Sequence, residues 1–393
     1  MALPPLVAPA AGLSPEEVER YSRHLLIPGM GLLGQRRLKN ARVLVVGAGG
    51  LGAPVLLYLA AAGVGTLGIA DFDVVEASNL QRQVIHRQSD VGRLKADSAA
   101  ESVAEVNALV RVIRHTDRLT SANALDVLAG YDLVVDGTDN FATRYLLNDA
   151  CVLLGRPDVW GSILRFEGQV SVFWAEPPAG SGWEGVHYRD VYPEPPPPGA
   201  VPSCAEAGVL GVLCGSIGSI MATETIKLLT GIGEPLLGRL MVYDALAMTY
   251  RTVVIRPDPA GRPVTGLIDY DAFCDPDPAP MDAPAPERAI SAVDLRVKMD
   301  AGADLLLVDV REPGEYDIVA IPGSVLVPLG GILSGAALAG LPRDRPLVLH
   351  CKSGARSAQA LAALDRAGFV GATHLSGGVL AWIQDVDPTL PSY

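Results

Sequence analysis

Two short segments, far apart in the chain, carry residues whose types and spacing could do chemistry. In the first, an apolar run beginning at Val43 leads into a glycine-rich turn that ends at Gly52. Glycines let the backbone come close to a phosphate, and the N-terminus of a following helix favours anions. In the second, an apolar run ending at His350 precedes a loop from Cys351 to Arg356. The first segment predicts a phosphate-binding turn, and the second predicts a ring of amides that stabilises a thiolate.

The glycine turn alone does not choose between NAD dehydrogenases, flavoproteins and enzymes that use ATP. Asp71 follows the next apolar run, where an acidic residue can bind ribose hydroxyls in any of these classes. Two cations further along, Arg82 and Lys95, indicate neutralisation of a triphosphate. Asp139 is placed at the end of a later strand, where a carboxylate oxygen can hold Mg²⁺. The combination favours ATP, and the glycines expected to line its site are Gly47, Gly49, Gly50 and Gly52.

Taken in order, these motifs resemble the MoeB/ThiF-type adenylyltransferases, an ATP-dependent family that activates ubiquitin-like proteins. The resemblance covers about residues 14–256. The matching segments are Arg20–His24, the glycine turn, Ser78–Gln83, Thr138–Asn140 and Val201–Glu206. In that family the C-terminal glycine carboxylate of a small carrier protein attacks the α-phosphate of ATP, which gives an acyl-adenylate and pyrophosphate.

The resemblance implies a role for each matching residue. Gly50 and Asp71 would contact the nucleotide, and Arg82 with Lys95 would offset charge on the α-phosphate. Asp139 would coordinate Mg²⁺. The remaining nucleotide contacts implied by the resemblance are Ser78, Asn79, Leu80, Gln81 and Asn140.

Two further residues gain a function only from the resemblance. Arg23 would reach into the active site of a dimer partner, although by itself it is interpreted as an ordinary solvated helix arginine. Cys204 lies just before a predicted helix whose N-terminus would activate a thiolate. In relatives the matching cysteine forms an acyl thioester or a disulfide. The alternative for a lone cysteine is a buried small side chain, which is the interpretation given to Cys151 and Cys214.

The chain departs from the family where close relatives hold a structural zinc with two CxxC pairs. The first aligned pair is His187 and Asp190, and the second lies near residues 262–265, where no cysteine or histidine occurs. One histidine and one aspartate do not make a good zinc site. The sequence therefore predicts that zinc is absent and that packing replaces it.

The loop from Cys351 to Arg356 has the pattern CX4R, whereas phosphatases use one residue more to surround a phosphate. The shorter ring suits a single sulfur atom and favours sulfur transfer. With the segments Val308–Tyr316 and Ile321–Ser324 upstream, it resembles a single rhodanese domain over about residues 289–393. In that family the cysteine carries the sulfane sulfur. A catalytically silent module is the alternative, but such modules usually lack the cysteine.

Composition limits the class of protein. A formal net charge of −13 on 393 residues argues against nucleic acid or an anionic membrane surface as the main partner. Five cysteines without a CxxC make no disulfide framework, so a reducing cytoplasm is expected. No signal peptide is evident in residues 1–13, and the apolar stretch 209–222 is too short and too rich in Gly and Ser to span a bilayer.

The order of elements predicts an α/β chain with two domains. Residues 1–13 are expected to be disordered, 14–272 to form the adenylyltransferase domain, 273–288 a proline-rich linker and 289–393 the rhodanese domain. After a helical stretch to Asn40, strands at 43–47, 67–71, 110–114 and 132–136 alternate with helices at 52–62, 95–107 and 121–129, which predicts a Rossmann-like doubly wound sheet. A strand at 168–174, a helix at 206–229 and a hairpin at 239–256 follow. The smaller domain has expected strands at 305–309, 325–328 and 347–350 and helices at 291–301 and 356–368.

The two domains together resemble adenylyltransferase–sulfurtransferase fusions. The implied partners are a small ubiquitin-like sulfur carrier ending in Gly-Gly and a sulfur donor, thiosulfate or a cysteine desulfurase, with ATP and Mg²⁺ used in a homodimer. The carrier is adenylated, Cys351 accepts sulfur as a persulfide, and attack on the adenylate, directly or through Cys204, followed by reduction frees a carrier thiocarboxylate. That product would supply molybdopterin synthesis or a related pathway.

Alternatives come from other classes of protein. A nicotinamide oxidoreductase would need neither the cluster of Arg82, Lys95 and Asp139 nor Cys351, and a carrier-binding scaffold would not need both loops intact. A tRNA-modifying relative of the same fold conflicts with the acidic charge and the rhodanese domain.

Overall fold

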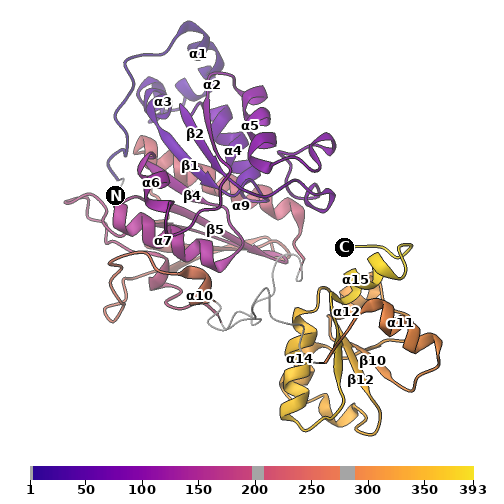
Figure 1. Cartoon of the computed structure of the whole chain (residues 1–393). Helices are drawn as coiled ribbons and strands as arrows, with labels where there is room; N and C mark the ends of the chain where they lie inside the picture. The colour runs from indigo at the N-terminus through magenta and orange to yellow at the C-terminus, as the bar shows by residue number, and fades with distance from the viewer. Residues whose placement is uncertain (1–2, 197–207, 275–287) are drawn as a thin grey trace. The chain divides into compact units, whose positions relative to one another are not determined.

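The computed structural model describes residues 3–196, 208–274 and 288–393, and the chain divides into two compact units between Asp277 and Pro278 (Figure 1). Most of the expected linker lies outside the described residues, as does Cys204 with the motif around it. Each unit is considered by itself below.

The first unit is built on an eight-stranded sheet in the order β3-β2-β1-β4-β5-β6-β7-β8. The strands are β1 (Arg42–Val46), β2 (Thr66–Ala70), β3 (Arg111–His115), β4 (Leu133–Asp136), β5 (Asp158–Leu164), β6 (Glu167–Phe173), β7 (Arg239–Asp244) and β8 (Thr249–Val254). The first five in that order are parallel, and β6, β7 and β8 run antiparallel to their neighbours. The central parallel strands β1, β2 and β4 are mostly apolar and buried because helices cover both faces, whereas the edge strand β3 carries two arginines and a histidine (Figure 1).

The helices of this unit are α1 (Pro15–Arg20), α2 (Ser22–Leu25), α3 (Gly31–Asn40), α4 (Gly52–Ala62), α5 (Lys95–Val106), α6 (Ala124–Ala129), α7 (Phe141–Leu154), α9 (Gly211–Thr230) and α10 (Tyr270–Cys274), with 3₁₀ turns η1 (Ala77–Asn79), η2 (Gln88–Asp90) and η3 (Tyr188–Asp190). Helix α4 packs against α5 and α9, while α6 packs against α7. The chain order reverses between β1 and β4, which is the topological switch point where open α/β sheets bind ligands.

Helix α9 is the one helix in the described residues that is long and apolar enough to cross a membrane. It packs against α4, α3, β5 and β6, and it carries the ion pair between Glu224 and Lys227. These contacts make it the central helix of the first unit. Its apolar composition follows from burial in the protein core.

The N-terminal segment differs from the prediction. Leu3 and Val7 are buried, the amide of Leu6 donates to the carbonyl of Leu228 on α9 at 3.0 Å, and that of Ala10 donates to Arg36 on α3 at 2.9 Å. The disorder expected for residues 1–13 is therefore wrong for residues 3–12. The prediction rested on a composition rich in Ala and Pro, and it gave no weight to the few apolar side chains that pack beside α3 and α9. The expected helical stretch to Asn40 is also broken, by Pro28 and Gly29 between α2 and α3.

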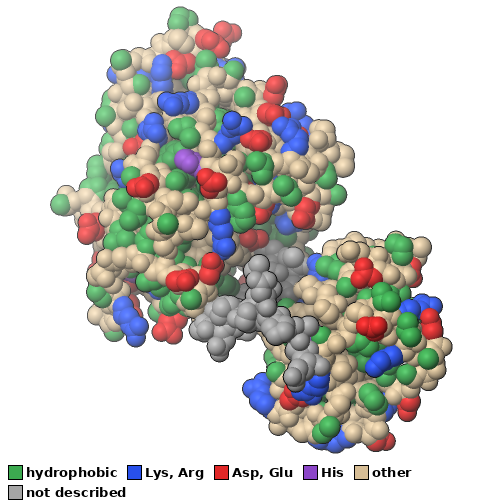
Figure 2. All heavy atoms as spheres, in the orientation of Figure 1, with side chains coloured by type: hydrophobic (Ala, Val, Ile, Leu, Met, Phe, Trp, Pro, Cys, Tyr) green, Lys and Arg blue, Asp and Glu red, His purple; other side chains and the backbone are tan. Residues whose placement is uncertain are grey.

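The second unit has a parallel five-stranded sheet in the order β11-β10-β12-β13-β9. Its strands are β9 (Ala289–Ile290), β10 (Leu306–Asp309), β11 (Val325–Leu326), β12 (Leu347–His350) and β13 (Thr373–Leu375). Its helices are α11 (Ala292–Asp300), α12 (Pro313–Ile318), α13 (Leu329–Leu333), α14 (Ala355–Arg366) and α15 (Gly378–Asp385), with the turn η4 (Leu338–Gly340). The predicted fold class, a doubly wound Rossmann-like sheet plus a smaller α/β unit, is confirmed. Positive and negative side chains are interspersed over the face drawn in Figure 2.

Candidate nucleotide and sulfur sites

A cavity of about 930 Å³, measured to its open mouth, lies at the carboxyl ends of β1, β2 and β4. Open α/β sheets bind their ligands at this edge, outside the carboxyl ends of the strands. The predicted residues that line it are Gly47, Gly49, Gly50, Asp71, Arg82, Lys95, Asp139 and Asn140. Parallel strands end at the same edge of the sheet, so loops distant in sequence meet there.

The glycine turn is shaped by one very close backbone approach. A Cβ atom at Gly52 would lie 1.8 Å from the carbonyl oxygen of Gly47, so only glycine fits where the turn enters α4. Gly52 is buried below the turn and lies outside the cavity wall. Its predicted role in binding is thus indirect, through the shape of the turn.

Acidic and basic groups are combined along one wall of the cavity. The carboxylate of Asp71 accepts hydrogen bonds from the amides of Ala48 at 2.8 Å and Asp73 at 2.9 Å, so it holds the glycine turn to the end of β2. Burial raises the pKa of Asp71, and the nearby charge of Lys95 opposes that rise. Lys95 begins α5, and its Nζ forms an ion pair with Asp73 at 2.9 Å. The wall therefore supplies a fixed cation beside a carboxylate that is already tied to the turn.

The loop that carries Asp139 is held from below by buried groups. Asp136 accepts hydrogen bonds from the amide and hydroxyl of Thr138 at 2.9 and 2.6 Å. Arg144 donates to the carbonyl of Thr138 at 2.9 Å and lies over the ring of Trp160. Burial raises the pKa of Asp136, opposed by the charge of Arg144. Asp139 is exposed toward the cavity as a result.

Some predicted contacts lie elsewhere. Ser78, Asn79, Leu80 and Gln81 belong to η1 and the residues after it, and this turn presents Arg82 and Gln83 to the cavity instead. Asn79 is buried and accepts a hydrogen bond from the amide of Glu76 at 3.2 Å, so it caps its own turn. Arg23 is exposed on α2, outside the cavity wall.

The cavity also has walls that sequence reasoning missed. Residues in the loops after β2 and β3 close one side, and they directly follow parallel strands, a position that could have identified them. These residues are Phe72, Asp73, Asp117, Arg118 and Leu119. Arg118 also forms an ion pair with Asp271 of α10 at 2.8 Å, so the last described segment of the first unit reaches this wall.

The loop from Cys351 to Arg356 connects β12 to α14. Cys351 is only 1% exposed, and its Sγ accepts a hydrogen bond from the amide of Gly354 at 3.1 Å. Gly354 has φ of +105°, a conformation that turns its amide toward the sulfur and that side chains disfavour. The geometry suits an anionic sulfur held by backbone N–H groups.

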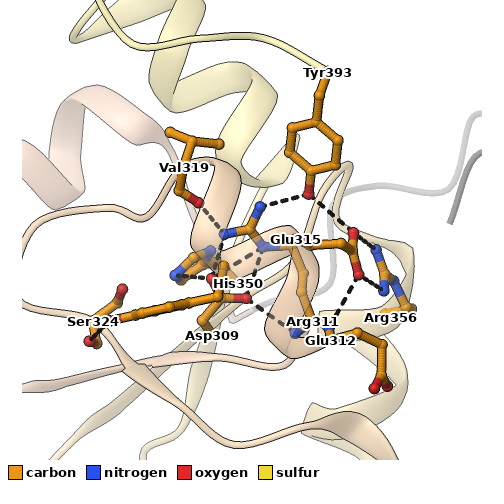
Figure 3. A network of polar contacts seen from close by, with 10 residues as sticks. Asp309, Arg311, Glu312, Glu315, Val319, Ser324, His350, Arg356 and Tyr393 are labelled. Carbon is orange, nitrogen blue, oxygen red and sulfur yellow. Dashed lines mark hydrogen bonds and ion pairs between the residues drawn. The ribbon is translucent and has the colours of Figure 1, made fainter. Parts of the chain in front are cut away.

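A chain of polar contacts lies beside this loop (Figure 3). Arg356 makes two hydrogen bonds to Glu315 on α12, both at 2.7 Å. Burial would raise the pKa of Glu315, but the hydrogen bonds from Arg356 and the amide of Glu312 leave it lowered. Behind them, Arg311 forms a fully buried ion pair with Asp309.

His350 lies under the loop and is completely buried. Its Nε2 is 3.7 Å from the Asp309 carboxylate, but burial lowers the pKa of His350 to about 4. Arg311 already neutralises that carboxylate with three hydrogen bonds. We therefore assign a neutral imidazole at neutral pH and not an ion pair.

Hydrogen bonds hold the segment 187–190, which the family resemblance aligns with a zinc-binding pair. The carboxylate of Asp190 accepts hydrogen bonds from the amides of His187 at 2.7 Å and Asp258 at 2.8 Å. Arg189 forms two hydrogen bonds to Asp149 on α7, at 2.8 and 2.7 Å. Within the described ranges, no group of three or more His, Cys, Asp or Glu side chains could hold a metal ion. Cys151 and Cys214 are buried, as expected.

The sequence matches the ThiF family over residues 21–263 and the rhodanese-like domain over residues 291–385. The chain belongs to the ThiF family and carries a rhodanese-like domain. It is 61% identical over 391 residues to a Mycobacterium tuberculosis protein named probable adenylyltransferase/sulfurtransferase MoeZ, with 100% of this chain and 99% of that protein covered. It is 41% identical over 422 residues to a Mus musculus protein named adenylyltransferase and sulfurtransferase MOCS3, with 99% and 90% covered.

Among solved structures, the first unit resembles Escherichia coli MccB with ATP, at a TM-score of 0.51 and 21% identity over 62% of this chain and 73% of that one. This likeness shows the fold. The full-length relatives show that the chain is an enzyme, an adenylyltransferase and a sulfurtransferase. The oxidoreductase and scaffold alternatives find no support among them.

Proposed function

We propose that this enzyme adenylates the C-terminal glycine of a small ubiquitin-like sulfur carrier ending in Gly-Gly and converts it to a thiocarboxylate. The observation that carries the proposal is the cavity at the switch point, where Lys95, Arg82 and Asp139 converge, in one chain with Cys351, whose Sγ accepts a hydrogen bond from the amide of Gly354. Relatives named for action on sulfur carriers support the substrate class, since a Thermus thermophilus protein named sulfur carrier protein adenylyltransferase is 54% identical over 266 residues.

The first half-reaction forms a bond between the carrier carboxylate and the α-phosphorus of ATP, and pyrophosphate leaves. Arg82 and Lys95 offset the negative charge that builds on the phosphate in the transition state. Asp139 fits a Mg²⁺ site, because that ion commonly takes one or two carboxylates together with substrate phosphates and water. Magnesium would neutralise phosphate charge and orient the leaving group.

In the second half-reaction, Cys351 takes a sulfane sulfur from thiosulfate or from a cysteine desulfurase. The outer sulfur of this persulfide attacks the adenylate carbonyl, AMP leaves, and a carrier–enzyme acyl disulfide forms. The thiolate of Cys204 or of an external thiol then attacks the Cys351 sulfur of this disulfide, and the thiocarboxylate leaves. The new disulfide on Cys351 is reduced by a further external thiol, which restores the Cys351 thiolate. The product is suited to molybdopterin synthesis or a related sulfur pathway.

We propose a cytoplasmic homodimer. Exposed apolar side chains follow Arg23 in the chain, from the end of α2 to the start of α3, and exposed apolar patches are typical of protein interfaces. They are Leu26, Ile27, Leu32 and Leu33, exposed by 76%, 49%, 54% and 48%. A twofold contact through this surface would bring Arg23 to the partner, where the family resemblance assigns it a role.

The experiment is ATP–pyrophosphate exchange with a Gly-Gly-ending carrier, followed by mass spectrometry of the carrier after thiosulfate is added. The matched control is the same carrier without its last glycine. We expect exchange and a thiocarboxylate with the intact carrier only. Exchange that does not depend on the carrier would exclude the proposed substrate.

A further inference from the structure

The chain of contacts beside the sulfur loop ends on Tyr393, in the segment that follows α15 (Figure 3). Its hydroxyl donates to Oε1 of Glu315 at 2.9 Å and accepts from Nη1 of Arg311 at 2.5 Å. Its ring lies under the ammonium of Lys352, with Nζ 4.5 Å from the ring centroid. One side chain therefore contacts the residue next to Cys351 and the carboxylate that holds Arg356.

The direction of these hydrogen bonds is fixed. Arg311 is anchored by Asp309 and by the carbonyl of Val319 at 2.7 Å, and a guanidinium can only donate. The phenolic oxygen must accept from it, so the single phenolic proton points at Glu315. Burial raises the pKa of Tyr393 to about 12, which keeps that proton in place at neutral pH.

The hydroxyl completes the restraint on Glu315. Oε1 accepts from Arg356 and from Tyr393, and Oε2 accepts from Arg356 and from the amide of Glu312 at 3.1 Å. A carboxylate held by this many donors has one orientation, and the paired hydrogen bonds transmit it to the guanidinium of Arg356. Arg356 closes the loop that begins at Cys351.

The ring has a separate effect. An ammonium over an aromatic face is attracted by the ring quadrupole, which restrains the otherwise flexible lysine chain. Lys352 directly follows Cys351, so the ring keeps a positive charge beside the sulfur loop. Anionic sulfur donors such as thiosulfate would be attracted by that charge.

We propose that Tyr393 is a positioning residue for sulfur transfer, which acts on Arg356 through its hydroxyl and Glu315 and on Lys352 through its ring. This inference rests on the proposed role of Cys351. In the reaction, the Cys351 thiolate attacks the outer sulfur of thiosulfate, the S–S bond breaks and sulfite leaves. Cyanide then attacks the outer persulfide sulfur, which releases thiocyanate and restores the thiolate.

Two substitutions separate the two effects. Tyr393→Phe keeps the ring and removes the hydroxyl, so kcat should fall by about tenfold while KM for thiosulfate stays close to that of the wild type. Tyr393→Leu removes both, so KM for thiosulfate should in addition rise by about threefold. Leu390→Ala, which loosens the packing of the same segment, is the matched control and should change neither constant.

A second readout does not depend on turnover. The guanidinium NMR signals of Arg356 should be sharp and protected from exchange in the wild type and in Leu390→Ala, and broadened in Tyr393→Phe. Unchanged kinetics and unchanged Arg356 signals in both Tyr393 variants would overturn the inference. Losses that match those of Leu390→Ala would also overturn it, because they would assign Tyr393 to stability alone. Cys351→Ala in the same assay tests the role of Cys351 independently.

Discussion

The two sites of this chain are organised in different ways. The nucleotide cavity is open and is assembled from loops after β1, β2, β3 and β4, with Asp139 exposed toward it. The sulfur site is a single loop in which Cys351 is 1% exposed and Arg356 is already bound to Glu315. The first arrangement accommodates a large charged ligand, and the second protects one reactive atom. The difference predicts that each site can be disabled without the other.

The largest expected effect is that of Asp139→Ala. Loss of the carboxylate removes the proposed Mg²⁺ ligand, so carrier-dependent ATP–pyrophosphate exchange should fall about 100-fold or more. Sulfur transfer from thiosulfate to cyanide should be unchanged, because that assay reports only the loop at Cys351. Asp126→Ala on α6 is the control on an exposed carboxylate. Loss of both activities in a folded Asp139→Ala variant would mean that the two sites are not separable.

The next comparison is between two cysteines. Cys351→Ala should eliminate the persulfide and the thiocarboxylate while adenylation continues. Cys204→Ala should reduce the thiocarboxylate yield less than Cys351→Ala does. The two losses should differ by at least about tenfold, which corresponds to about 1.4 kcal/mol of barrier. Mass spectrometry of the carrier, with ATP and thiosulfate present, measures both. A full yield from Cys351→Ala would show that sulfur reaches the adenylate by another route.

Much of this organisation was predictable because it follows local patterns. The expected helix 52–62 and strand 347–350 have those same bounds in the structure, since a glycine turn and an apolar run define their ends. The expected nucleotide contacts Ser78 to Gln81 do not line the cavity, whereas the next two residues, Arg82 and Gln83, do. A motif gives the position of a turn, but which side chains face the cavity depends on how that turn packs.

Long-range contacts were beyond the reach of the sequence. Nothing local connects Tyr393 with Glu315, or Leu3 with the core beside α9, because these pairs form only when distant elements pack. Helix α10 was missed for the same reason. It is short, and Tyr270 anchors it by donating a hydrogen bond to Asp149 on α7 at 2.7 Å.

Asp149 provides a test of stability in the nucleotide unit. Asp149→Ala leaves Arg189 without its ionic partner between the rings of Tyr145 and Phe273, where the guanidinium lies 4.8 and 5.0 Å from the centroids. Breaking a buried pair in this way should cost about 3 kcal/mol, measured by urea unfolding. Asp300→Ala, which breaks the exposed pair with Arg296, should cost less than about 1 kcal/mol. Equal losses of unfolding free energy in the two variants would show that the pair of Arg189 and Asp149 contributes no more to stability than an exposed ion pair.

The same region carries the prediction about zinc. Asp190, which the family resemblance aligns with a zinc ligand, accepts hydrogen bonds from the amides of His187 and Asp258. We expect elemental analysis of the purified, untagged protein to find far less than one zinc per chain. A stoichiometric content would contradict this and would require ligands other than His187 and Asp190.

A pH dependence of stability is expected in the rhodanese unit alone, and it is present only under acidic conditions. His350 has a pKa of about 4 when folded, against an ordinary value of 6.5, because it is fully buried. Between pH 6.5 and 4 the His350 imidazole is therefore protonated in the unfolded state and neutral in the folded state. The free energy of unfolding falls as pH drops through this range, by up to about 3 kcal/mol. Urea unfolding of 5-fluorotryptophan-labelled protein, followed at the ¹⁹F signal of Trp382, isolates this unit.

His350→Gln should weaken the dependence between pH 6.5 and 4, because glutamine does not titrate there. An identical pH profile in wild type and His350→Gln would assign the dependence to other groups and would mean that burial does not lower the pKa of His350.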